Sequence, residues 1–187
     1  MNISTEEKKV ILQIARNSIA SIYNASVTSK VDISKYPILS SQKGAFVTLT
    51  KNKNLRGCIG YIISDIPLHE TIKDAATQAA IGDPRFPKLT ENEFSKIEIE
   101  VSILSEPFPM ESYDDIIVGK HGLILTESGH RGLLLPQVPI EHGMNKEQYL
   151  SALCEKTGFY SNFWKEKILN IEMFTADVFS EMEFENE

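Results

Sequence analysis

Residues 55–60 read Leu-Arg-Gly-Cys-Ile-Gly, and this stretch decides the fold. A run of good strand residues, 45–50, precedes it, and the polar residues 51–54 separate the two segments. The pattern predicts a β-hairpin whose second strand, residues 55–63, carries Arg56 and Cys58. Because side chains alternate along a strand, we expect these two on one face, roughly 6–7 Å apart, where the guanidinium favours the thiolate.

Gly57 and Gly60 interrupt the same predicted strand. Glycine inside a strand weakens it and usually marks a bulge or the close approach of another group. The strand is therefore expected to leave room beside Arg56 and Cys58. A second interpretation fits the same residues: Cys58 is a small buried hydrophobic residue, and the glycines allow tight packing of the sheet.

The composition is that of an ordinary soluble domain, with 187 residues, 42% of them apolar and 24% charged. We expect one domain over residues 1–187, or two intimately packed subdomains. The net charge of −7 disfavours binding to nucleic acid or to an anionic membrane. The polar residues 1–9 indicate no signal peptide, and no apolar run is long enough to span a bilayer. A cytoplasmic protein with reduced thiols is predicted.

Periodicity along the rest of the chain predicts an α+β fold with mostly antiparallel sheets and packed helices. The predicted helices cover residues 5–24, 67–81 and 146–157, and the predicted strands cover residues 45–50, 55–63, 97–104, 123–127, 131–135 and 171–179. The predicted strands at residues 123–127 and 131–135 form a second hairpin, which is apolar on both faces and is therefore expected at a central position in its sheet. An aromatic group is expected to pack in the core: Phe159, Tyr160, Phe163 and Trp164. The acidic end, with Glu181, Glu183, Glu185 and Glu187, is expected to be frayed and solvated.

Two loops carry polar residues in unusual backbone contexts. Residues 83–87 read Asp-Pro-Arg-Phe-Pro, and the two prolines stiffen a loop suited to forming the wall of a binding site. A salt-bridged turn that ties two elements together is the alternative. His121, between Gly119 and Gly122, is a candidate base for Cys58, or else a hydrogen-bonded structural residue. The histidines and Cys154 show no metal-ligand spacing, so no metal site is predicted, and no cofactor is indicated.

The hexapeptide at residues 55–60 resembles the signature of the AMMECR family, called AmmeMemoRadiSam system protein A in microbes. Further stretches are similar to motifs of the same family, in the same order: residues 83–87, 99–105, 118–123 and 132–138. The resemblance covers nearly the whole chain. It implies an α+β fold in two subdomains around a cleft. The frequent association of the family with a Memo-type protein and a radical SAM protein implies such partners and a shared modification pathway.

Two functions from different classes fit these residues. The first is a ligand- or partner-binding regulatory module whose cleft is lined by the strand at residues 55–60, with binding residues Arg56, Gly57, Gly60, Asp83, Arg85 and Phe86. The alternative is an enzyme in which Cys58 is the nucleophile and His121 its partner. The sequence leaves open whether the protein is an enzyme, and it indicates neither the substrate nor the oligomeric state.

Overall fold

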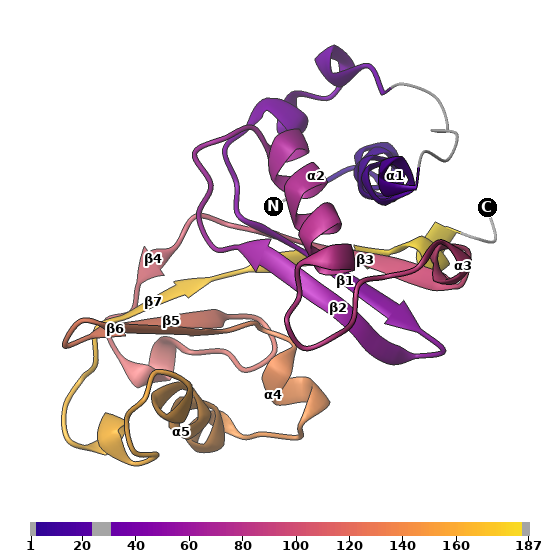
Figure 1. The fold of residues 1–187 in the computed structure, drawn as a ribbon. Coiled ribbons are helices and arrows are strands. Elements are labelled where there is room, and N and C mark those ends of the chain that lie inside the picture. The colour runs from indigo at the N-terminus through magenta and orange to yellow at the C-terminus, as the bar shows by residue number, and fades with distance from the viewer. Residues whose placement is uncertain (1–2, 24–30, 185–187) are drawn as a thin grey trace. The chain divides into compact units, whose positions relative to one another are not determined.

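The computed structural model describes residues 3–23 and 31–184 (Figure 1). The chain divides into two compact units: unit 1 comprises residues 1–104 and 177–187, and unit 2 comprises residues 105–176. Each unit has its own four-stranded sheet, and each assigned strand register is antiparallel. The predicted α+β class is therefore confirmed.

The sheet of unit 1 has the strand order β2-β1-β3-β8. Its strands are β1 (Ala45–Lys51), β2 (Asn54–Tyr61), β3 (Ile97–Leu104) and β8 (Ala176–Ser180). Asn52 and Lys53 join β1 to β2 with φ angles of 52° and 63°. Positive φ at both central residues of a two-residue turn defines a type I′ hairpin, whose twist matches that of the strands. The predicted first hairpin is confirmed.

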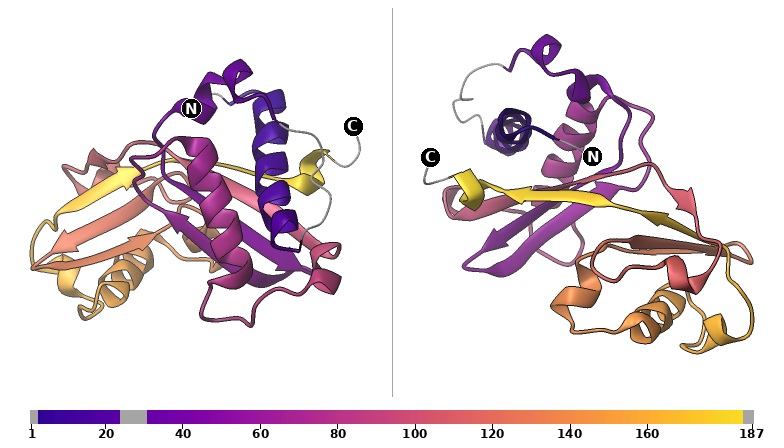
Figure 2. Two further views of the ribbon diagram at one scale, coloured as in Figure 1. Left: turned by 45° about the horizontal axis from the view of Figure 1, so that its top comes forward. Right: turned by 180° about the vertical axis from the view of Figure 1, so that it is seen from behind.

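Two helices cover one face of this sheet, α1 (Thr5–Ile22) and α2 (Leu68–Ile81) (Figure 2). A capping box formed by Ser4 and Glu7 opens α1, and Gly82 ends α2. Their apolar faces join the inward residues of the strands in one core, including Val47, Leu49, Ile99 and Val101. A third, short helix, α3 (Glu91–Phe94), begins with a capping box at Thr90. Two 3₁₀ helices, Ile33–Lys35 and Pro37–Ser40, precede β1.

The register between β1 and β2 contains a β-bulge. Leu49 pairs with Gly57, and the next residue of β1, Thr50, pairs with Leu55, so Arg56 is the extra residue. A bulge breaks the simple alternation of side chains along a strand. The guanidinium of Arg56 binds Glu93, and the cation that acts on the Cys58 thiol is Arg85, so the expected pairing of Arg56 with the thiol is not found.

The sheet of unit 2 has the strand order β4-β7-β5-β6. Its strands are β4 (Phe108–Pro109), β5 (Gly122–Glu127), β6 (His130–Leu134) and β7 (Ile171–Phe174). The helices are α4 (Val138–Glu141), which was not predicted, and α5 (Lys146–Lys156), which Asn145 caps. The second hairpin is present, but β6 lies at the edge, so only its partner β5 is central.

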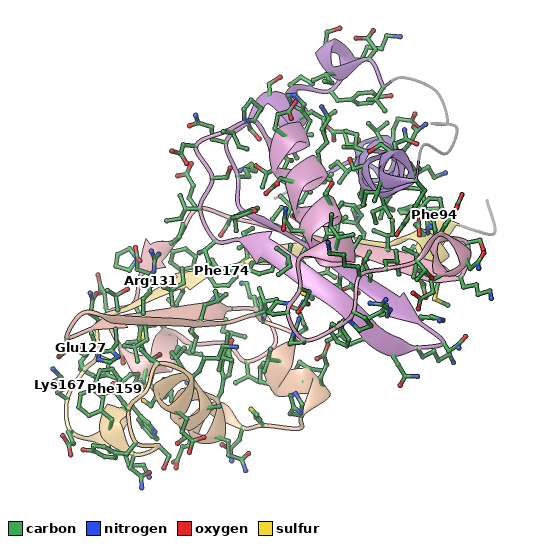
Figure 3. All side chains as sticks on the ribbon, viewed as in Figure 1. Phe94, Glu127, Arg131, Phe159, Lys167 and Phe174 are labelled. Carbon is green, nitrogen blue, oxygen red and sulfur yellow. The ribbon has the colours of Figure 1, made fainter. Side chains whose placement is uncertain are left out.

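The aromatic group after α5 packs against the core of unit 2, as predicted. Phe159 stacks on Phe163 with 4.4 Å between ring centroids, and both contact the core together with Trp164. Tyr160 differs, because 55% of its surface is exposed. In Figure 3 the labelled side chains of Glu127 and Lys167 lie near Phe159, and they form an ion pair of 3.0 Å.

Two predictions for the C-terminal part of the chain are wrong. The single strand expected at residues 171–179 divides at Thr175, so that β7 belongs to the sheet of unit 2 and β8 to that of unit 1. The acidic end is ordered as far as the structure describes it: residues 181–184 form a 3₁₀ helix, and Arg16 binds the Glu181 carboxylate. Glu185 and Glu187 lie outside the described residues, as does the predicted helix end at residue 24.

Candidate functional site

The backbone of Cys58 is bound by two side chains at the outer edge of β2. The Cys58 N–H donates to Oδ2 of Asp83 at 2.9 Å, and the Cys58 carbonyl accepts from Nη2 of Arg85 at 3.2 Å. Both backbone groups therefore point away from β1, which makes Cys58 and Thr48 a non-hydrogen-bonded pair with closely spaced side chains. Asp83 and Arg85 thus occupy the place of a neighbouring strand at this edge. We call these two side chains the Asp83–Arg85 clamp.

Asp83 is the buried half of the clamp, with 2% of its side chain exposed. Besides the Cys58 N–H it accepts from Arg85 through the backbone N–H at 3.1 Å, Nε at 3.0 Å and Nη2 at 2.7 Å. Hydrogen bonds from the Arg85 side chain are the largest cause that holds the pKa of Asp83 well below its usual range, against the opposing effect of burial. The structure therefore contains the salt-bridged turn, and the use of this loop as a binding-site wall stays a prediction.

Asp83→Asn is expected to lower the free energy of unfolding at pH 7 by about 2 kcal/mol, because a buried charge-assisted pair is lost. The folded-state pKa of Asp83 is depressed, so its contribution is present above the unfolded carboxyl pKa of about 4 and is lost as the pH falls below it. The difference between wild type and variant should accordingly shrink at pH 3. Urea unfolding at the two pH values measures this.

Asp114→Asn is the matched control, because the Asp114 side chain is fully exposed and its ion pair with Lys146 is long, at 3.8 Å. It should change stability by less than about 0.5 kcal/mol at either pH. An Asp83→Asn variant as stable as this control would contradict the role given to the clamp.

The Cys58 thiol is half-buried and accepts a hydrogen bond from Oγ1 of Thr48 at 3.3 Å. Burial raises the pKa of this thiol, and the hydrogen bond from Thr48 and the charge of Arg85 oppose the shift only in part. The cation that acts on Cys58 is therefore Arg85 and not Arg56. At neutral pH the thiol is protonated, a state that is a poor nucleophile.

The two glycines of the hexapeptide make room for backbone and ring atoms. A Cβ on Gly57 would lie 2.1 Å from the carbonyl oxygen of Ala79 in α2, so the helix approaches the strand here at the closest range. A Cβ on Gly60 would lie 2.5 Å from the Phe46 ring, which covers it from the paired position on β1. Tight packing, the second interpretation of these glycines, is what the structure shows.

Arg56 is held by Glu93, a partner that the sequence did not reveal. Nε and Nη2 of Arg56 donate to the two carboxylate oxygens at 3.2 Å and 3.0 Å, and Lys51 donates to Oε1 at 2.8 Å. The same carboxylate closes the capping box of α3 through Thr90. Hydrogen bonds from Arg56, then Lys51, lower the pKa of Glu93. The bond between Arg56 and Glu93 spans 37 positions and therefore leaves no local signal in the sequence.

His121 belongs to unit 2 and is 7% exposed. Its Nδ1 accepts from the backbone N–H of Ile117 at 3.3 Å, and its ring meets Phe108 edge to face. Burial and then the charge of Lys120 lower its pKa, so the ring is neutral at pH 7. Since Nδ1 accepts, the proton of the neutral ring resides on Nε2. These contacts are those of a hydrogen-bonded structural residue.

The structure thus groups part of the predicted site. Cys58, Asp83, Arg85 and Phe86 form one connected cluster, and Arg56 belongs to a separate network with Glu93. Gly57 and Gly60 flank Cys58 on β2 and pack against Ala79 and Phe46. The convergence of His121 with Cys58 stays a prediction. Within residues 3–23 and 31–184, no three His, Cys, Asp or Glu side chains are grouped to hold a metal ion. None of the helices described is long and apolar enough to cross a membrane.

Comparison with known proteins identifies the family to which this chain belongs. The AMMECR1 family model matches residues 12–179. The chain is 40% identical to protein MJ0810 of Methanocaldococcus jannaschii, over 97% of this chain and 93% of that protein. It is 38% identical to a protein of Thermococcus onnurineus, with 96% and 92% covered. The chain belongs to the AMMECR1 family.

A solved structure shares the fold. The crystal structure of uncharacterized protein PH0010 from Pyrococcus horikoshii superposes with a TM-score of 0.86 at 33% sequence identity. The match covers 96% of this chain and 93% of that one. Family membership therefore defines the fold, and the activity has to be inferred from the chemistry of the site.

Proposed function

We propose that the protein is a ligand- or partner-binding regulatory module, and that its binding surface is the edge of β2 around Cys58. The observation that carries this proposal is the state of the thiol. It is half-buried, protonated at neutral pH, and part of a backbone segment fixed by the Asp83–Arg85 clamp. Rigid presentation of polar groups lowers the entropy cost of binding, whereas nucleophilic catalysis requires a thiolate.

The alternative, an enzyme with Cys58 as nucleophile, is not supported by the side chains that bond to Cys58 in the described part of unit 1. Thr48 donates to the sulfur and cannot hold its proton as a base, and Asp83 is committed to Arg85 and the backbone. His121 offers a protonated Nε2, because its Nδ1 accepts from Ile117. A neutral imidazole removes a proton through its unprotonated nitrogen, so His121 as it stands is a hydrogen-bond donor.

Family association suggests where such a module acts. Memo-type and radical SAM proteins are the partners proposed for it, and the cytoplasm is the proposed compartment. Two free cysteines in the described residues are compatible with a reducing compartment. The cleft and its lining by residues 55–60 remain part of this proposal.

Alkylation of Cys58 by iodoacetamide tests the proposal. At pH 7 we expect Cys58 to react more slowly in the folded protein than in the chain unfolded in urea, because its raised pKa leaves less thiolate. The rate should still be rising at pH values at which an ordinary thiol is already fully ionised. Cys154 is 0% exposed and provides the internal reference, which should react more slowly still. Mass spectrometry of the two cysteine peptides measures both rates.

The opposite result has a clear meaning. If folded Cys58 reacts faster at pH 7 than the same cysteine in the unfolded chain, the site stabilises a thiolate. The nucleophile hypothesis would then replace the binding module.

A further inference from the structure

Arg85 is the exposed half of the Asp83–Arg85 clamp, with 54% of its side chain open to solvent. Three residues hold its guanidinium: Nε and Nη2 bind Asp83, Nη2 also donates to the Cys58 carbonyl, and the Phe86 ring lies 5.5 Å from its central carbon. A long side chain normally loses rotamer freedom when it binds a ligand. For Arg85 that freedom is already lost in the folded protein.

One nitrogen of this fixed guanidinium is left over. The hydrogen bonds that Arg85 makes to oxygens within residues 3–23 and 31–184 use its backbone N–H, Nε and Nη2. Nη1 takes part in none of them, and it carries two N–H groups. Both donors belong to a planar cation, which suits the oxygens of a carboxylate or a phosphate. Nε and Nη2 are sufficient to bind Asp83 and the Cys58 carbonyl at the strand edge. The two N–H groups of Nη1 are therefore not needed for the clamp itself.

We propose that Arg85 is an anion-recognition residue, which binds a carboxylate or phosphate oxygen of the ligand beside the Cys58 thiol. The proposal rests on the proposed function, since it names the ligand class for the same surface. Asp83 balances the charge of Arg85, so the attraction is that of an exposed ion pair. Such a pair contributes little affinity by itself, and its main effect is to select anionic over neutral ligands.

The test compares two alkylating reagents that differ in charge. Iodoacetate carries a carboxylate and iodoacetamide is neutral, and both react with the same sulfur. The ratio of their rates at Cys58, divided by the ratio for a small free thiol, should be raised about two- to fivefold if Arg85 attracts the anion. Changes in the exposure or pKa of Cys58 affect both reagents, so they cancel in the ratio.

Variants assign the effect to Arg85. Arg85→Gln should return the ratio to that of the free thiol, and Arg85→Lys should retain part of it. Arg131→Gln is the control, because it changes the net charge equally and Arg131 is not among the charges that act on Cys58. A wild-type ratio equal to that of the free thiol, or a raised ratio that survives Arg85→Gln, would overturn the proposal.

A competition experiment needs no variant and separates the two kinds of anion. Inorganic phosphate and acetate are added in turn at constant ionic strength. Each should slow iodoacetate at Cys58 and leave iodoacetamide unchanged, and the stronger competitor identifies phosphate or carboxylate as the preferred group. If neither competes, anion binding at Arg85 is refuted even where slow iodoacetamide labelling upholds the binding module. Fast iodoacetamide labelling would refute the module alone.

Discussion

Gly57→Ala is expected to lower the free energy of unfolding by about 3 kcal/mol, because overpacking against backbone is difficult to relieve. The new Cβ would lie 2.1 Å from the carbonyl oxygen of Ala79, an atom fixed within α2. Either the helix or the strand must move, and both contribute to the core of unit 1. Urea unfolding followed by circular dichroism measures the change.

Gly129→Ala separates the effect of the clash from the general effect of replacing a glycine. Gly129 has a φ of 80° in the turn between β5 and β6, and a Cβ there would meet no atom within 4 Å. Its replacement should cost only about 1 kcal/mol, from backbone strain. If the two variants lose equal stability, the close approach of α2 to Gly57 is not what limits this position.

Arg16→Met is expected to cost about 3 kcal/mol, since it leaves a partly buried carboxylate and two carbonyls without their donor. Arg16 binds Glu181 through Nε and Nη2, and it donates to the carbonyls of Phe94 and Ile97 at 3.0 Å each. Glu181 in turn accepts from the N–H of Ile99 at 2.9 Å. One side chain thereby joins α1, the end of α3, the start of β3 and the C-terminal 3₁₀ helix. Urea unfolding at pH 7 gives the loss.

A double-mutant cycle assigns the loss to this network. Arg16→Met combined with Glu181→Gln should lose less than the sum of the single changes, by at least about 1 kcal/mol. Arg131→Met, at an exposed arginine of unit 2, serves as the control and should change stability by less than about 0.5 kcal/mol. Strict additivity of the two substitutions would show that the pair contributes nothing beyond its separate contacts.

Local signals explain which parts of the fold were predictable. The capping boxes at Ser4 and Thr90, the glycine after α2 and the turn residues before β2 each act within a few positions of the element that they define. The break at Thr175 was missed because residues on both sides have strand propensity, and only the choice of sheet separates them. Likewise, apolar residues on both faces of β6 did not reveal that it lies at an edge.

The sequence indicated several residues of the site, but it did not indicate the hydrogen bonds that connect them. The stiff loop at residues 83–87 was recognised, yet its attachment to the backbone of Cys58 depends on contacts across 25 and 27 positions. Gly57 indicated a bulge or a close approach, but nothing in the strand itself showed that Arg56 would be the extra residue or that Glu93 would bind it. Its partner Glu93 lies in α3, where the local sequence explains only its role in the capping box and not its bond to Arg56.

The division of the last strand has a consequence for the order in which the protein is made. The sheet of unit 1 takes β1, β2 and β3 from the first 104 residues, but its edge strand β8 begins only at residue 176. During synthesis the ribosome therefore releases all of unit 2 before it releases the strand that completes unit 1. Until then β3 has an unpaired edge, and the Arg16 side chain lacks Glu181. Unit 2 is in effect an insertion, and the nascent chain must hold an incomplete first sheet for more than 70 residues of elongation.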